Sequence, residues 1–307
     1  MMSHIPVLLN ESISYLITKK DGIYIDATFG YGGHSKKILE SISPNGLLIA
    51  IDRDINAINE GKKNFANIDN FKLYHSNFSQ INEILKNLNI SKVDGILFDF
   101  GVSSMQIDNP ERGFSYNSDA FLDMRMDQTQ KLSAYDVINT YSEEQLCFII
   151  KEYGEERFAK KIARKIVETR TKNEIKTCGQ LNEIVNSVVP KPRDGSNPAR
   201  RTFQAIRIEV NDELGEIKEA LNKAIDILNS GGRICAISFH SLEDRIVKEF
   251  FRFESLSCIC PKDIPVCVCN KTKTLDIITK KPITPSQEEL QINKRSHSAK
   301  LRVAQKI

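Results

Sequence analysis

The chain has 307 residues, of which 40% are hydrophobic and 27% are charged, with a formal net charge of +3. This length and composition can bury a large core in one large or two modest domains, which argues against a disordered protein. The apolar runs are too short to span a bilayer, and the start of the chain lacks the features of a signal peptide. We therefore expect a folded, cytoplasmic protein without a membrane segment, in which any affinity for nucleic acid comes from a local basic surface.

A strand, a tight turn and a helix are predicted near the start of the chain. The apolar segment 22–25 is typical of a strand, and the turn that follows contains Gly30, Gly32 and Gly33. A helical pattern begins at about Ile38. Glycine-rich turns between a strand and a helix are common in nucleotide-binding folds, although many are plain connectors.

A second predicted strand, 47–51, ends at Asp52, where a doubly wound fold places the acid that binds a ribose diol. This position favours a ligand that contains adenosine. The dinucleotide fingerprint also needs a third glycine, and Ser35 occupies that place. S-adenosylmethionine fits better, because it has no pyrophosphate, and we expect the glycines to let the backbone approach its methionine part.

Two later strands are predicted at 93–98 and 233–239, and a helix at 213–228 precedes the second. They carry Asp99 and His240 to their carboxyl ends, where open α/β sheets have their active sites. Between these strands, apolar residues recur at helical spacing, namely Leu146, Ile149, Ile150, Ile162, Ile166 and Val167. We expect a discontinuous α/β domain at 1–108 and 208–307, with an inserted helical domain at 109–207.

The predicted insertion is locally basic. Residues 151–172 contain eight Lys or Arg against four Glu, and like charges stand one turn apart, as at Lys161 and Lys165. A solvated helix face is the commoner reason for such a run. A second cluster adds an aromatic ring and an amide to phosphate-binding charge, and comprises Arg193, Arg200, Arg201, Phe203 and Gln204. Together the two clusters favour RNA or DNA as the substrate.

Four cysteines lie within twelve residues as two Cys-x-Cys pairs, Cys258 with Cys260 and Cys267 with Cys269. Four thiolates can bind tetrahedral zinc, although Cys-x-x-Cys is the more typical spacing. An exposed reduced loop is an equally good interpretation, so the metal is left unassigned. A disulfide framework is not expected in a reducing compartment, and Cys235 is expected in the core of a strand.

Several long motifs together resemble the bacterial ribosomal RNA small subunit methyltransferase H family over nearly the whole chain. They are, in order, HIPVLLNE at 4–11, DATFGYGGHS at 26–35, DFGVSSMQID at 99–108, RGFSY at 112–116, LDMRMD at 122–127, YGEERFAKKIA at 153–163, RTFQAIRIEVN at 201–211 and ISFHSLEDRIVK at 237–248. The chain departs from the family pattern at Phe100, Met105, Asn197 and Arg200. None of these departures removes a polar group that the chemistry obviously needs, although Asn197 and Arg200 bear on RNA contacts.

The resemblance implies a Rossmann-like class I methyltransferase sheet with an inserted all-helical domain that recognises RNA. The implied reaction moves a methyl group from S-adenosylmethionine to N4 of a cytidine in the decoding region of 16S ribosomal RNA. The implied substrate is this RNA in an assembled or nearly assembled small subunit, and a homodimer is left open. The implied cofactor contacts are Gly32, Gly33, His34, Asp52, Phe78, Asp99 and Gln106.

The exocyclic amine of cytosine is a poor nucleophile, so a site must hold N4 in line with the methyl group and accept a hydrogen bond from it. Asp99 is the leading catalytic candidate, with His240 in second rank, for which a structural role is at least as good an interpretation. The target base must also be exposed. Candidate stacking residues are Phe114, Tyr116 and Phe203, while Phe100 is expected in the core.

Two other functions are weighed against this one. An assembly factor that binds RNA and cofactor without catalysis would tolerate replacement of Asp99. A nicotinamide oxidoreductase would need a pyrophosphate loop, and the missing third glycine argues against it.

Overall fold

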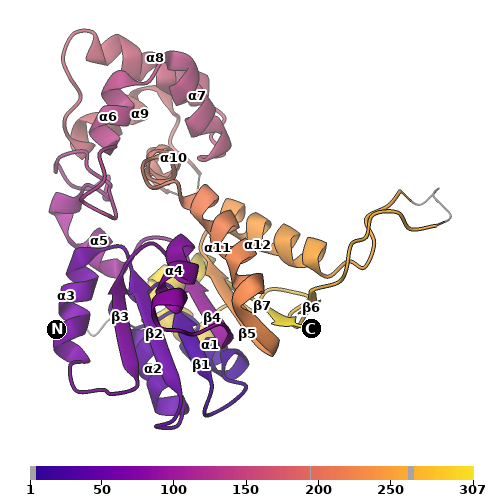
Figure 1. Cartoon of the computed structure of the whole chain (residues 1–307). Coiled ribbons are helices and arrows are strands. Elements are labelled where there is room, and N and C mark those ends of the chain that lie inside the picture. Colours follow the sequence, from indigo (N-terminus) through magenta and orange to yellow (C-terminus); the bar gives the residue numbers. More distant parts are fainter. Residues whose placement is uncertain (1–4, 194, 262–265) are drawn as a thin grey trace. The chain divides into compact units, whose positions relative to one another are not determined.

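Figure 1 shows the computed structural model of the chain, which describes residues 5–193, 195–261 and 266–307. His4, the first residue of the first family motif, lies outside the described residues. The chain divides into two compact units, one formed by Met1–Gly101 with Leu214–Ile307 and the other by Val102–Glu213. The boundaries expected from the sequence, at 108/109 and 207/208, fall inside the second unit. The second expected boundary falls within a helix that continues to Asn211, after which Asp212 takes a left-handed conformation with a φ of 44°.

The first unit contains a seven-stranded sheet in the order β3-β2-β1-β4-β5-β7-β6. The strands are β1 Ile23–Asp26, β2 Leu47–Asp52, β3 Phe71–His75, β4 Val93–Asp99, β5 Leu228–Ser238, β6 Leu275–Ile277 and β7 Lys300–Lys306. Strands β1 to β5 pair in parallel, and β7 pairs antiparallel with β5 and β6. The expected α/β, Rossmann-like methyltransferase fold with a helical insertion is confirmed.

Successive residues of the central strands feed two separate cores, which explains why these strands read as continuous apolar runs. Ile25, for example, packs in one cluster with side chains from α4 (Ile81–Asn87) and α11 (Glu213–Ile227), while Tyr24 packs in another with side chains from α1 (Leu9–Leu16) and α2 (Gly33–Ser41). The helices of this unit are α1 Leu9–Leu16, α2 Gly33–Ser41, α3 Ile55–Asn64, α4 Ile81–Asn87, α11 Glu213–Ile227, α12 Ser241–Glu254 and α13 Gln287–Ile292, with short 3-10 turns at Phe78–Gln80 and Lys294–Ser298.

The basic C-terminal tail folds back onto the sheet as β7, as the family resemblance favoured, but it is not an edge strand. Strand β7 lies between β5 and β6, because β6 covers its outer side. Arg302 donates to Asp244 of α12 with a distance of 2.6 Å between Nε and Oδ1. The charge of this tail residue therefore holds β7 to a neighbouring helix.

The second unit is helical, and its hydrophobic core contains Leu146, Ile149, Ile150, Ile162 and Ile166, as the spacing predicted. Its helices are α5 Ser104–Asp108, α6 Ala134–Thr140, α7 Glu143–Glu152, α8 Ala159–Arg170, α9 Cys178–Val188 and α10 Arg200–Asn211, with a 3-10 turn at Pro110–Arg112. Capping boxes begin α6, α7 and α9. Among the described residues of both units, no helix is long and apolar enough to cross a membrane.

Candidate functional site

Acidic residues end three adjacent strands of the sheet. Asp26, Asp52 and Asp99 are the last residues of β1, β2 and β4, and β1 lies between the other two. The turn after β1 is bonded to both neighbours, because the hydroxyl of Thr28 accepts from the backbone N–H of Asp99 at 2.8 Å and Phe29 N donates to Ile51 O at 2.9 Å. The structure thus brings two predicted site residues, Asp52 and Asp99, to the same sheet edge as the glycine turn.

Glycine is needed at the three positions of the turn for different structural reasons. A Cβ on Gly32, whose φ is +76°, would lie 2.7 Å from the ring of Phe29, and one on Gly33 would lie 2.2 Å from Pro6. Gly30 also has a positive φ, of +53°, but a Cβ there would meet nothing within 4 Å. Packing inside the protein therefore explains Gly32 and Gly33, and Gly30 is the glycine that faces open space.

Asp26 and Ser35 join the turn to the helix that follows it. The Ser35 hydroxyl donates to Asp26 Oδ2 at 2.6 Å, and Asp26 Oδ1 accepts from Thr28 N at 3.2 Å. Complete burial raises the pKa of Asp26 to about 6 in spite of these bonds. Ser35, which stands where a dinucleotide fingerprint has its third glycine, is thus a fixed partner of a buried acid.

Asp52 is half-buried and already bound to the turn. Its Oδ2 accepts from Gly30 N at 2.7 Å, and its Oδ1 accepts from Asp54 N at 2.8 Å. Burial raises the pKa of Asp52 to about 6, against the effect of these two bonds. Each carboxylate oxygen keeps a second lone pair, so Asp52 can also accept hydrogen bonds from a ribose diol.

His34 contacts both the N-terminal segment and Asp99. The side chain is 6% exposed, and burial lowers its pKa to about 4, so the imidazole is neutral at pH 7. Its Nε2 lies 3.0 Å from the carbonyl oxygen of Val7, which can only accept, so we assign the proton to Nε2. The other nitrogen, Nδ1, lies 3.6 Å from Asp99 Oδ2 and is left as an acceptor.

Asp99 has the most strongly perturbed carboxyl group of the three strand ends. Burial raises its pKa well above the ordinary value, and the nearby charges of Asp26 and Glu243 raise it further. Its side chain is still 23% exposed, which leaves room for a ligand to reach it. The Oδ1 atom is buried and has no hydrogen-bond partner among the described residues. An orphaned acceptor beside a glycine turn fits a ligand that carries an amino group.

Phe78 and Gln106, the other two predicted cofactor contacts, have clear structural roles. The Phe78 ring belongs to a buried aromatic cluster, with centroid distances of 6.1 Å to Phe98 and 6.0 Å to Phe100. Phe100 is buried, as expected. Gln106 lies in the second unit, where it forms the capping box of α5 with Ser103, whose backbone N–H donates to Gln106 Oε1 at 3.1 Å.

His240 caps a helix. Its Nδ1 accepts from the backbone N–H of Glu243 at 3.4 Å, and Glu243 Oε2 accepts from the N–H of Phe239 and of His240, at 2.7 and 3.2 Å. This reciprocal pair begins α12 and favours the structural interpretation of His240.

Part of the basic surface of the second unit is exposed and part of it is used internally. Lys160, Lys161 and Arg164 are exposed on α8. Arg170 at the end of the same helix instead donates to the carbonyl of Ile138 at 2.6 Å. The run therefore contains both solvated charges and a structural residue.

The second predicted cluster is only partly a surface feature. Arg200 is exposed, but Phe203 is 4% exposed and packs edge-on against Tyr116, and Gln204 donates to the carbonyl of Tyr153 at 3.0 Å. Phe203 and Gln204 are thus committed to the helical core. Phe148 of α7, which the sequence analysis did not single out, is 58% exposed.

Comparisons with known proteins agree over the full length of the chain. The family described as MraW methylase matches residues 1–307. The chain is 69% identical over 307 residues to the ribosomal RNA small subunit methyltransferase H of Caldicellulosiruptor saccharolyticus, covering 100% of both chains. It is 67% identical to the protein of the same name from Caldicellulosiruptor bescii, again covering 100% of both, and 52% identical to that of Clostridioides difficile, covering 99% of each.

Proposed function

Since the chain belongs to the MraW methylase family, we propose that it transfers a methyl group from S-adenosylmethionine to N4 of a cytidine in the decoding region of small-subunit ribosomal RNA. The observation that carries this proposal is the 69% identity, over the whole chain, to a ribosomal RNA small subunit methyltransferase H. The acidic edge of the sheet supports it, because it offers acceptors for a ribose, an amino group and a reacting amine.

Cofactor binding is proposed at the carboxyl edge of β1, β2 and β4. Asp52 accepts from the ribose hydroxyls, and Asp99 Oδ1 accepts from the amino group of the methionine part. Phe78 is included although its ring already contacts Phe98 and Phe100 in T-shaped arrangements. The full proposed set is Gly32, Gly33, His34, Asp52, Phe78, Asp99 and Gln106.

When bound, S-adenosylmethionine supplies an electrophilic methyl group on a sulfonium. Asp99 accepts a hydrogen bond from the N4 amine, which holds the amine in line and removes its proton as the new bond forms. A raised pKa makes this carboxyl a better proton acceptor than an exposed aspartate, provided that a nearby positive charge keeps it ionised. Asp99 then releases this proton to solvent through its exposed part, because the imidazole of His34, whose pKa burial lowers to about 4, is a weaker base than Asp99.

Substrate binding is proposed to use the exposed cations of α8 with Arg200. Their solvated charges suit a phosphate backbone, and the target base becomes accessible by flipping or because the RNA is locally single-stranded. We propose an assembled or nearly assembled small subunit as the substrate and the cytoplasm as the site of the reaction. A homodimer is a separate proposal, which sedimentation of the purified protein would test.

The proposal is tested by transfer of labelled methyl groups to unmodified small subunits and to naked ribosomal RNA, with digestion to nucleosides. We expect label in N4-methylcytidine at one decoding-region position. A non-catalytic assembly factor would instead bind S-adenosylmethionine, transfer no label to either substrate, and tolerate Asp99→Ala in cells.

A further inference from the structure

The segment between α12 and β6 leaves the sheet and returns to it, and its described parts bury few apolar side chains. Its base is fixed, because Glu254 accepts from Lys271 Nζ at 2.8 Å and the backbone N–H of Thr274 donates to Glu254 O at 2.9 Å. Beyond this base the described parts of the segment run outward (Figure 1). Its large apolar side chains Val266 and Val268 are exposed, so they do not form a core for it. Something other than hydrophobic burial must hold this segment together.

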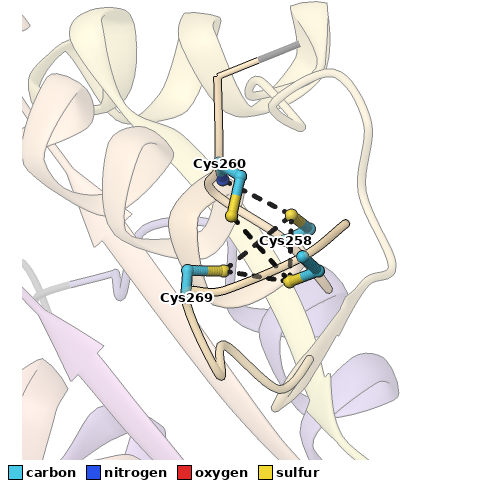
Figure 2. Close-up of side chains that lie close together, drawn as sticks. Cys258, Cys260 and Cys269 are labelled. Carbon is cyan, nitrogen blue, oxygen red and sulfur yellow. Dashed lines mark hydrogen bonds between the residues drawn. The ribbon is translucent and has the colours of Figure 1, made fainter. Parts of the chain in front are cut away.

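The four cysteine sulfurs of this segment converge (Figure 2), and their Sγ atoms all lie within 4.8 Å of one another. The Sγ of Cys267 lies 3.4 Å from that of Cys258, 3.5 Å from that of Cys269 and 3.9 Å from that of Cys260. A zinc ion bound to sulfur at about 2.3 Å in a regular tetrahedron separates the sulfurs by about 3.8 Å. A disulfide would need about 2.05 Å. The spacing therefore matches the edges of a metal tetrahedron.

Backbone amides support the sulfurs in the way that thiolate ligands require. Ile259 N donates to Cys269 Sγ at 3.3 Å, Val268 N to Cys260 Sγ at 3.4 Å, and Cys260 N to Cys258 Sγ at 3.4 Å. Such bonds favour the thiolate over the thiol and orient it. Converging thiolates repel one another unless a cation lies between them.

We propose that Cys258, Cys260, Cys267 and Cys269 bind one structural zinc ion. Each thiol that binds gives its proton to solvent, and four thiolates with Zn²⁺ leave a net charge of −2, which the backbone N–H groups partly offset. Four protein ligands leave no open coordination position, so the ion has a structural and not a catalytic role. It links the outgoing and returning parts of the segment where apolar packing does not.

The test uses the full chain purified without chelators, with zinc measured by elemental analysis and the tetrahedral thiolate site probed by replacement with Co²⁺. The double variant Cys258→Ser with Cys267→Ser removes two ligands, and Cys147→Ser is the matched control because Cys147 lies on α7 outside the cluster. We expect one zinc per chain and thiolate-to-cobalt charge-transfer absorption in the wild type and in Cys147→Ser, and neither in the double variant.

A second readout separates loss of the metal from loss of the fold. Removing zinc from the wild type with a strong chelator should increase proteolytic cleavage within 255–274 at least tenfold, while S-adenosylmethionine binding stays unchanged. Wild-type protein without zinc, whose four clustered thiols react freely with a thiol reagent, would overturn the proposal in favour of an exposed reduced loop. Equal zinc content in the double variant would also overturn it.

Discussion

The sheet unit and the helical unit use charged residues in opposite ways. At the sheet edge, Asp26 is fully buried and Asp99 partly buried, and burial raises the pKa of both carboxyl groups. On α8, Lys160 and Lys161 are exposed to solvent. Buried charges interact strongly with neighbouring groups because they are little screened, whereas solvated charges interact weakly and in a salt-dependent way. The buried carboxylates suit chemistry on one atom, and the exposed lysines suit attraction of a polyanion. Substitutions at the sheet edge should therefore change kcat, and substitutions on α8 should change the affinity for RNA.

The largest expected effect is on kcat, and it distinguishes Asp99 from Asp94, which lie at opposite ends of β4. We predict that Asp99→Asn lowers kcat at least about 100-fold, because it removes the acceptor for the N4 proton. The matched control is Asp94→Asn at the other end of the strand, where Asp94 accepts from Lys19 Nζ at 2.8 Å and Ile23 N at 3.0 Å.

For this control we expect an unchanged kcat and a loss of about 1–2 kcal/mol in the free energy of unfolding. Steady-state kinetics on small subunits and denaturant unfolding measure the two quantities. If Asp99→Asn kept kcat within about fivefold of the wild type, Asp99 would not be the proton acceptor.

The next effect concerns the pH dependence of cofactor binding. The pKa of Asp99 is raised in the free protein, and a cationic ligand lowers it, so binding of S-adenosylmethionine should release a proton. Affinity should therefore fall as the pH drops below the pKa of Asp99 in the free protein, by up to about tenfold per pH unit. Calorimetry in buffers of different ionisation enthalpy measures the proton release. The Asp99→Asn variant should lose the proton release that comes from Asp99 and keep any that comes from Asp52 and Asp26. An unchanged pH dependence of affinity in Asp99→Asn would assign the effect to Asp52 and Asp26.

A smaller effect is expected from the exposed cations. Lys160→Gln with Lys161→Gln should weaken RNA binding several-fold and reduce the slope of log K against log salt by about 0.7–0.9 for each lost phosphate contact. At saturating substrate, kcat should not change. The control is Lys62→Gln with Lys63→Gln on α3, which removes the same exposed charge from the sheet unit. Equal losses in both variants would show that net charge, and not α8, is responsible.

The smallest effect tests the role of His240. As a helix cap, it should be replaceable by Asn, which also caps well, whereas His240→Ala should cost about 1 kcal/mol of stability. Thermal unfolding of both variants measures this difference. A large loss of kcat in His240→Asn, with stability retained, would instead make His240 a proton carrier.

Much of the fold followed from local patterns, because β1, β2, β4 and β5 are buried on both faces and read as apolar runs. Strand β6 was not predicted, since its three residues give too short a signal. Without β6, the tail strand could not be placed inside the sheet. The second unit of the structure continues to Glu213, past the expected end at 207, because a helix that continues past a boundary has no local stop signal.

The site was predictable as a set of motif residues but not as a set of roles. Gly33 stands where it does because Pro6, distant in sequence, packs against it, and only the folded chain reveals that contact. The same holds for His34, whose tautomer depends on the carbonyl of Val7. The residue types of Phe203 and Gln204 suggested RNA contacts, but in the folded chain both side chains make contacts inside the helical unit.

The most direct measurement compares Asp99→Asn with the Lys160→Gln, Lys161→Gln pair on the same small subunits, recording single-turnover methyl transfer at saturating protein and the dissociation constant for RNA. We predict that Asp99→Asn abolishes transfer and keeps RNA affinity, while the lysine pair weakens affinity and keeps the saturated transfer rate. Loss of RNA binding in Asp99→Asn, or a fall of the saturated rate in the lysine pair, would contradict the separation of chemistry and recognition between the two units.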